Sequence, residues 1–328
     1  MSVPGWPVAF RGSLAVAAGL VTRDRLRGPC YRRLFPDVYA PVGPEPPDLA
    51  LRSRAAYRLV EGRGVLSGWS AAKVLGASCG PWDAPAEVTV PGRDQRAHPG
   101  LAVRRDRLHP GEITSVDDVR TTTPLRTAFD LGRLDDLVDA VVGVDALAHE
   151  YCFNPDLLLH FAARYRRARG VLRLPEVLTH ADRRAMSPME TRLRMLLVLA
   201  GLPRPVAQHP VQDPVARTAV WLDLAYPERH IGIEFEGEQH ARPEDVLRDV
   251  GRYTGLVDAG WRIYRYTKDE IRDEPGRISP RSAAPSTGEI DVIGVPGPEN
   301  PDHVDLTRQT PLASRTRVTI SSIISVSL

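Results

Sequence analysis

The sequence contains few cysteines, few lysines and no long hydrophobic run. Its three cysteines, Cys30, Cys79 and Cys152, are odd in number and widely spaced, so they indicate neither a disulfide framework nor a zinc site. No hydrophobic run reaches the length of a membrane span, and polar residues interrupt the apolar part of the N-terminus, unlike a signal peptide. These absences predict a protein of the reducing cytoplasm without a membrane segment.

The composition is that of a globular protein, with 42% hydrophobic and 26% charged residues among 328. This length suits two ordinary domains. The net charge of +2 is too small to indicate nucleic-acid binding by itself. Lys73 and Lys268 are the only lysines, so nearly all cations are arginines. Arginine suits bidentate contacts with phosphate, but a GC-rich genome produces the same bias, and we give that explanation more weight.

Acidic residues interrupt two apolar segments in WLDLAYPERHIGIEFEGEQH, residues 221–240. Residues 227–230 supply a turn, which predicts a β-hairpin. Alternation with period two places Asp223 on the face opposite Leu222 and Leu224. The same alternation places Glu234 and Glu236 opposite their apolar neighbours. All three carboxylates are therefore expected to project from one face of the hairpin.

Three carboxylates on one face repel one another unless a cation lies between them. Oxygen ligands favour Mg²⁺ or Mn²⁺, and Mg²⁺ usually takes one or two carboxylates together with water and substrate phosphate. Asp223 and Glu234 are the expected metal ligands. His240 follows closely and is a candidate general base or acid, because its proton exchanges near neutral pH. This pattern is typical of a phosphodiesterase site.

Three segments in order resemble the PD-(D/E)XK restriction-endonuclease-like superfamily, in particular domains similar to very-short-patch-repair endonucleases. They are residues 187–211, 222–240 and 248–267, about a quarter of the chain. The resemblance implies a core in the order helix, three strands, helix, strand. It also implies that Asp223 takes the PD aspartate position, Glu234 the (D/E) position, and Glu190 the acidic position on the first helix.

The chain departs from the superfamily at the motif lysine, where Glu236 stands. Related domains carry an acidic residue there, followed by a glycine and a downstream histidine, which corresponds to His240. The positive charge is then left to Arg248, Arg252 or Lys268, and the sequence does not decide between them. By the resemblance, Glu190 and Glu236 assist catalysis, and His240 transfers a proton.

Each of these residues also has a structural interpretation. Ser187-Pro188-Met189-Glu190 forms a capping box with proline at the first helical position. Glu236 is also explained as a solvated strand-end charge, and His240 as a hydrogen-bonded loop residue. Arg248 and Arg252 lie four apart on one helix face, which fits both phosphate contacts and a solvated basic stripe. Gln208 is similar to a glutamine often seen in the superfamily after the first helix.

The N-terminal segment, residues 13–41, predicts a short helix-turn-helix with a wing. A helix ends at Gly19, Thr22 caps a second helical turn, and a basic stretch leads into a strand at residues 34–39. The segment resembles the N-terminal region of AbiEi-like antitoxins of abortive-infection systems. The resemblance implies DNA binding, with phosphate contacts from Arg23, Arg25, Arg32 and Arg33. An equally ordinary interpretation of these four residues is a solvated basic loop.

The likeness to AbiEi continues through residues 65–76, 86–108 and 119–133, which predict a helix, a small sheet and a helix capped at Thr123-Pro124. Residues 134–161 predict further helix, and residues 163–170 a basic linker or helix. We therefore expect the following division: a winged helix-turn-helix-like region at 1–60, an AbiEi-like α+β region at 61–162, a linker helix at 163–186, an endonuclease-like domain at 187–275, and a tail at 276–328.

The tail is rich in proline, serine, glycine and threonine and lacks a helical period, which predicts disorder. An altered reading frame is a second explanation for the sharp change in composition. The expected fold class is α/β (α+β), a C-terminal restriction-endonuclease-like αβββαβ core after a winged-helix-like α+β domain.

The expected function is Mg²⁺- or Mn²⁺-dependent cleavage of DNA in defence or repair by a cytoplasmic bacterial protein. The alternative is a non-catalytic, DNA-binding antitoxin or repressor with a degenerate nuclease fold, whose partner is a cognate toxin. Convergence of the carboxylates favours the enzyme, whereas a binder needs only the arginines.

Overall fold

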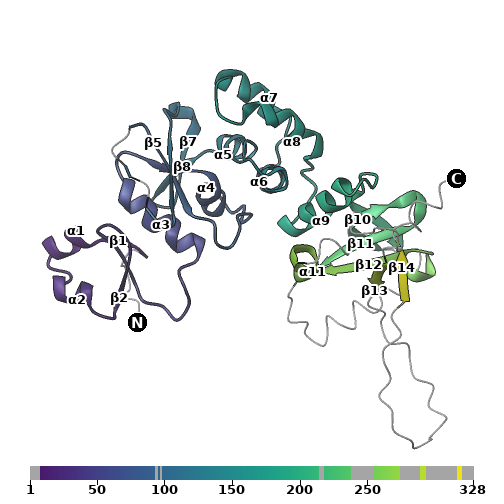
Figure 1. Cartoon of the computed structure of the whole chain (residues 1–328), viewed down its shortest axis with the longest axis horizontal. Coiled ribbons are helices and arrows are strands. Elements are labelled where there is room, and N and C mark those ends of the chain that lie inside the picture. Colours follow the sequence, from purple (N-terminus) through teal and green to yellow (C-terminus); the bar gives the residue numbers. More distant parts are fainter. Residues whose placement is uncertain are drawn as a thin grey trace, which may run out of the picture. The chain divides into compact units, whose positions relative to one another are not determined.

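A computed structural model describes residues 8–92, 95–96, 98–213, 218–237, 255–273, 289–292 and 316–319. The chain divides into two compact units, Met1–Pro188 and Met189–Leu328, each of mixed α/β structure (Figure 1). Within the described ranges, no helix has the length and apolar character needed to cross a membrane.

The first unit begins with a small antiparallel sheet of order β1-β3-β2. Thr22 caps the second helix, as predicted, by accepting a hydrogen bond from the backbone N–H of Arg25. The elements are β1 (Phe10–Arg11), α1 (Gly12–Ala17), α2 (Arg23–Arg27), β2 (Tyr31–Phe35) and β3 (Val38–Pro41).

The strand expected at residues 34–39 is wrong, because a hairpin turn between β2 and β3 divides it. Pro36 lacks a backbone N–H, and Asp37 adopts a left-handed conformation with φ of 59°. The Asp37 carboxylate accepts hydrogen bonds from the backbone N–H and the hydroxyl of Ser13. A contact distant in sequence therefore stabilises this turn.

A second sheet of order β6-β5-β4-β8-β7 follows, with parallel pairing of β4 with β8 and β5 with β6. The expected cap at Thr123 is confirmed: its hydroxyl accepts from the backbone N–H of Arg126, and Pro124 begins the helix. The strands are β4 (Val65–Leu66), β5 (Ala86–Val90), β6 (Leu101–Arg105), β7 (Ile113–Val116) and β8 (Val119–Thr122).

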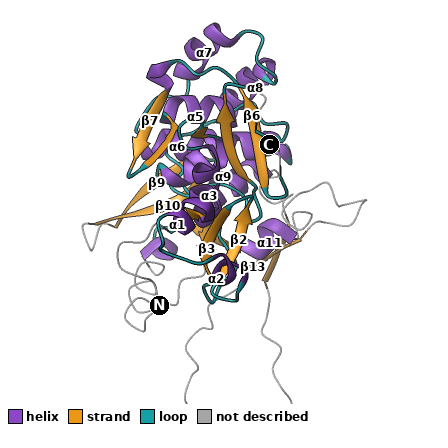
Figure 2. Cartoon of the chain, turned by 90° about the vertical axis from the view of Figure 1, so that its left-hand side faces the viewer, coloured by secondary structure: helices purple, strands orange, loops and turns teal. Residues whose placement is uncertain are grey.

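The helix α3 (Leu49–Val60) packs on β2 and β3 and also on β5. Figures 1 and 2 both show it between the small sheet and the larger one. Its buried residues Ala55, Tyr57 and Val60 share one hydrophobic cluster with Val38 of β3 and Val88 of β5. One core therefore continues across residue 60, where the sequence suggested a division.

The remaining helices of this unit lie between strands of the larger sheet or follow its last strand. The further helix expected over residues 134–161 forms two helices, which are separated between Glu150 and Leu157, where Cys152 has a left-handed φ of 51°. The helices are α4 (Gly68–Val74), η1 (Pro110–Glu112), α5 (Pro124–Leu131), α6 (Leu137–Glu150), α7 (Leu157–Ala162), η2 (Ala163–Tyr165), η3 (Val171–Arg173) and α8 (Leu174–His180).

The second unit contains a four-stranded sheet of order β12-β11-β10-β9. Strands β9, β10 and β11 are antiparallel neighbours, and β12 pairs with β11 in parallel. The elements are α9 (Pro188–Leu199), β9 (Val206–Asp213), β10 (Thr218–Tyr226), η4 (Pro227–Arg229), β11 (Ile231–Glu236), β12 (Arg262–Thr267) and α11 (Lys268–Asp273). The expected hairpin turn is confirmed at η4, which His230 ends in a left-handed conformation.

Within the segment expected to be disordered, two short strands, β13 (Glu289–Val292) and β14 (Thr316–Thr319), pair antiparallel. The rest of that segment from residue 276 onward lies outside the described residues. The second explanation for this segment, an altered reading frame, stays a hypothesis.

Candidate functional site

The first candidate site lies on the four-stranded sheet of the second unit. Leu224 of β10 pairs with Ile233 of β11, so Asp223 and Glu234 are the next residues along the two strands. The Asp223 carboxylate accepts a hydrogen bond from the backbone N–H of Phe235 over 2.8 Å. Asp223 is thereby held against the backbone beside Glu234.

The alternation predicted around Asp223 is wrong, because Leu222 and Leu224 do not share a face. Leu224 packs in the hydrophobic cluster with α9, whereas Leu222 packs in a second cluster that contains Trp261. Leu222 and Leu224 pair with β9 residues on either side of Gln208, whose φ is 52°. This irregularity interrupts the period of two at Asp223.

Glu234 is buried, with 7% of its surface exposed, and a parallel pair places Arg265 of β12 beside it. The Nε of Arg265 lies 3.7 Å from Oε2 of Glu234, and its Nη1 lies 3.9 Å from Oε1 of Glu236. These distances indicate ion pairs without direct hydrogen bonds. Glu234 and Glu236 therefore project from the same face of β11, as predicted.

Glu190 lies in the first turn of α9, which begins at Pro188 as predicted. Its side chain is buried, and its carboxylate accepts a hydrogen bond from the Gln208 side chain over 2.9 Å. Gln208 therefore links the acidic residue of α9 to the sheet at the position beside Asp223. A buried carboxylate requires such donors because burial without them is costly.

Two carboxylates on neighbouring strands form a donor set that fits Mg²⁺ or Mn²⁺, which bind few protein oxygens and complete their shells with water and phosphate. Among the residues that the structure describes, no group of three or more His, Cys, Asp or Glu side chains could hold a metal ion. Asp223 and Glu234 are the residues that would hold such an ion. His240, Arg248 and Arg252 lie outside the described residues.

The second candidate site comprises the four arginines expected to contact phosphate, which lie on α2 and β2. Arg23 and Arg25 are exposed on α2, and Arg32 and Arg33 are exposed on β2. Arg23 and Arg25 therefore lie on a helix next to the small sheet, and Arg32 and Arg33 lie on a strand of that sheet.

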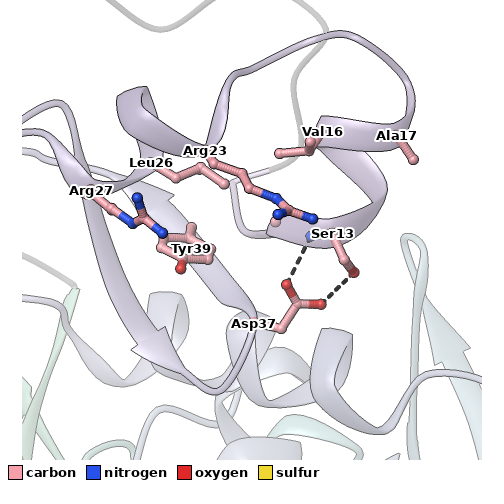
Figure 3. A pocket seen from close by; sticks show the side chains of 9 residues that line it. Ser13, Val16, Ala17, Arg23, Leu26, Arg27, Asp37 and Tyr39 are labelled. Carbon is pink, nitrogen blue, oxygen red and sulfur yellow. Dashed lines mark hydrogen bonds between the residues drawn. The ribbon is translucent and has the colours of Figure 1, made fainter.

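A hollow of about 460 Å³ lies between α1, α2 and β3. Figure 3 shows Arg23 and Arg27 of α2 bordering this hollow together with Asp37, whose carboxylate is bonded to Ser13. Partial burial opposes ionisation of Asp37, but hydrogen bonds from Ser13 and the nearby Arg11 outweigh it and lower the pKa of the carboxyl. As an ionised residue, Asp37 therefore holds α1 against the β2–β3 hairpin.

Comparisons with known proteins place the chain among uncharacterized relatives. No model of a known protein family matches it. The uncharacterized protein Rv2248 of Mycobacterium tuberculosis (strain ATCC 25618 / H37Rv) is 31% identical over 227 residues, covering 67% of this chain and 82% of the relative. The uncharacterized protein MT2308 of Mycobacterium tuberculosis (strain CDC 1551 / Oshkosh) matches equally well. The chain belongs to the Rv2248 family.

The crystal structure of the RV2827C protein from Mycobacterium tuberculosis aligns with this Rv2248-family chain at a TM-score of 0.36 and 15% sequence identity. The alignment covers 65% of this chain and 86% of that chain.

Sequence patterns did not predict a role for Arg265 in this Rv2248-family chain. The available signal was the segment RIYRYT, in which alternation separates Arg265 from the buried Tyr264 and Tyr266. Recognising its partner also required the parallel pairing of β11 with β12. Lys268, one of the expected sources of positive charge, is exposed at the start of α11.

Proposed function

We propose that this chain is a metal-dependent nuclease that hydrolyses phosphodiester bonds in DNA. The observation that carries the proposal is the set of charged residues on one sheet. Asp223 and Glu234 lie side by side on β10 and β11, and Arg265 lies in register on β12. Glu190 reaches the same sheet through Gln208.

The order of elements supports a restriction-endonuclease-like core. The helix α9 precedes three antiparallel neighbours, β9, β10 and β11, and β12 then pairs in parallel with β11. In the first unit, α1, α2 and the β2–β3 hairpin support a winged-helix-like arrangement. The resemblance in sequence motifs supports the same assignment.

In the proposed mechanism, Asp223 and Glu234 would hold Mg²⁺ or Mn²⁺. When bound, the ion stabilises charge on the attacked phosphate and lowers the pKa of water. The hydrogen bond from the backbone N–H of Phe235 orients Asp223. Glu190 and Glu236 assist directly or through water.

The same mechanism needs a positive charge in place of the motif lysine. Arg265 supplies this charge in our proposal, because it already lies beside Glu234 and Glu236. His240 transfers a proton in the mechanism.

The test is cleavage of supercoiled and linear DNA by the purified full-length protein with Mg²⁺, Mn²⁺ or EDTA. Nicking that requires the metal and disappears in the Asp223→Ala/Glu234→Ala variant is the expected result. Glu228→Ala/Asp258→Ala is the matched control, because both residues are exposed in the same unit and outside the carboxylate cluster. Equal activity of the two double variants would contradict the proposed site.

A second candidate function is a DNA-binding antitoxin or repressor without catalysis. Arg265 favours it, because an arginine paired with both Glu234 and Glu236 offsets part of their charge without a metal. Its DNA contacts would be Arg23, Arg25, Arg32 and Arg33, and its protein partner a cognate toxin. Salt-sensitive DNA binding without cleavage in any metal would support this function. Both proposals place the protein in the cytoplasm.

A further inference from the structure

A second hollow, of about 850 Å³, lies in the first unit between β6, α5 and residues 163–169. Eight arginines and two aspartates line it. Several of these arginines come from the segment ARYRRARG, for which the sequence suggested only a linker or helix. The fold therefore brings cations together from three places in the chain.

Arg126 of α5 forms the floor of this hollow and is 1% exposed. Its guanidinium donates to Asp130, Glu112 and Asp106 over 3.0, 2.9 and 2.6 Å. Burial works against its charge, but Asp130 and Asp106 outweigh burial and raise the pKa of Arg126. Because carboxylates already surround it, Arg126 holds a fixed position beneath the exposed arginines of the hollow.

Contacts to this floor hold residues 163–169 in place. The Tyr165 hydroxyl donates to Glu112, and the Tyr165 ring lies 4.9 Å from the Arg126 guanidinium carbon. Arg133 donates to the backbone carbonyl of Arg169 over 2.6 Å. The segment is therefore anchored at both ends, and its other arginines are presented from a fixed backbone.

Two of the exposed arginines on this segment lack a nearby carboxylate, whereas the exposed Arg169 pairs with Asp135 over 3.2 Å. In the described part of the chain, the side chains of Arg166 and Arg167 make no hydrogen bond or ion pair, and both residues are exposed. Arg164 lies 3.9 Å from Glu112, which already accepts from Arg126 and Tyr165. The hollow therefore presents an excess of positive charge.

On the opposite wall, the exposed Arg105 donates only to the backbone carbonyl of Gln95 among the described residues. Its neighbour Arg104 is paired with the buried Glu87 over 2.8 Å. The two lining aspartates, Asp106 and Asp130, are bonded to Arg126, and Asp130 also to Arg133. Positive charge therefore remains uncompensated on two sides of a concave surface, which concentrates the electrostatic potential.

The side chains that line the hollow favour phosphate groups over nucleotide bases as ligands. Guanidinium groups match phosphate oxygens in bidentate geometry. The aromatic ring in the lining, that of Tyr165, is already packed against Phe129, Phe161 and Arg126. A nucleotide base would therefore find no free aromatic ring to stack on among the lining residues.

We propose that this hollow binds consecutive phosphate groups, with Arg105, Arg164, Arg166 and Arg167 as the contacting side chains. Such groups come from a nucleic-acid backbone or from a nucleoside polyphosphate. The site lies in the first unit and uses none of the residues of the proposed nuclease site.

The test measures fluorescence anisotropy of the full-length protein in EDTA with two probes, a labelled 12-nucleotide single strand and a labelled nucleoside triphosphate. We expect the Arg166→Gln/Arg167→Gln variant to bind at least one of the two probes at least tenfold more weakly than the unsubstituted protein. For the single strand, the slope of log K against log salt should also fall by about 1.4, because two phosphate contacts are lost. Arg166→Lys/Arg167→Lys should retain most of the salt dependence.

The matched control is Arg120→Gln/Arg183→Gln, since both arginines are exposed in the same unit and lie outside the lining. Loss of affinity for the single strand alone would assign the hollow to nucleic acid. Loss of affinity for the triphosphate would assign it to nucleotides. Unchanged binding of both probes, or equal losses in the two glutamine double variants, would overturn the proposal. EDTA chelates divalent metal ions and so prevents metal-dependent cleavage, and anisotropy measures binding alone. The outcome is therefore independent of the nuclease test.

Discussion

Arg265 of β12 lies in register with Glu234 of β11, and its Nε is 3.7 Å from the Glu234 carboxylate. The same guanidinium reaches within 3.9 Å of Glu236. Glu234 and Glu236 therefore have a cation beside them on the neighbouring strand. This pair is central to both proposed functions, because a nuclease needs the charge for phosphate, whereas a binding protein needs it only to balance the carboxylates.

If Arg265 stabilises charge on the attacked phosphate, Arg265→Ala should reduce metal-dependent DNA cleavage about 100-fold, the usual effect of removing one such group. Arg265→Lys should restore part of the activity, because it keeps the charge but loses the planar guanidinium. Single-turnover cleavage of a labelled duplex measures both effects.

Arg262→Ala is the control for Arg265, since Arg262 is an exposed residue of the same strand. Cleavage that is equal in the Arg262 and Arg265 variants would show that Arg265 has only a structural role.

The hydrogen bond between Gln208 and Glu190 should contribute to the stability of the second unit. Gln208→Leu removes a donor from a buried carboxylate, which typically costs about 1–3 kcal/mol in the free energy of unfolding. Urea denaturation should show this loss. Gln212→Leu changes an exposed residue of the same strand and should alter stability by less than about 0.5 kcal/mol. Equal effects of the two substitutions would argue against a specific role for the bond.

Removing the guanidinium of Arg126 should destabilise the first unit strongly. Arg126→Met leaves Glu112 and Asp130 buried without their main partner, and breaking a buried ion pair on one side costs about 3–5 kcal/mol. Thermal and urea unfolding both measure the change. The exposed pair of Arg27 with Asp24 provides the comparison, because Arg27→Met should cost less than about 1 kcal/mol. Similar losses for both variants would contradict the interpretation of Arg126 as a buried support.

Acidification should weaken the contact between Asp37 and Ser13. Because the folded-state pKa of Asp37 is lowered, its stabilisation is complete above the unfolded-state pKa of about 3.9 and is lost as pH falls further through the folded pKa. Asp37→Asn keeps a residue that tolerates a positive φ but removes the charge. The difference in unfolding free energy between the two proteins should be constant from about pH 5 to 7 and shrink below about pH 4. A difference that is independent of pH down to about pH 3 would exclude this role for the carboxylate.

Local signals in the sequence predicted several boundaries correctly. Thr22 and Thr123 cap helices, Pro188 begins α9, and residues 227–230 form a turn. Each depends on hydrogen bonds or backbone preferences within a few residues of the chain. Boundaries that depend on distant contacts were missed, as at Asp37, whose turn is bonded to Ser13.

The alternation through Asp223 failed for a related reason. A period of two assumes a regular strand, but the pairing with β9 is irregular at Gln208. The neighbouring prediction on β11 held because that strand is regularly paired with β12. The faces of a strand are therefore predictable only as far as its pairing is regular.

By itself, the sequence determined the helix starts, the hairpin of acidic residues and the concentration of arginine, because these follow from residue types and short spacings. Only the tertiary structure decided that Arg265 is the cation beside Glu234, that Gln208 holds Glu190, and that Arg105 and Arg166 line one hollow. These relationships depend on strand register and on the packing of segments far apart in the chain, which no local pattern encodes.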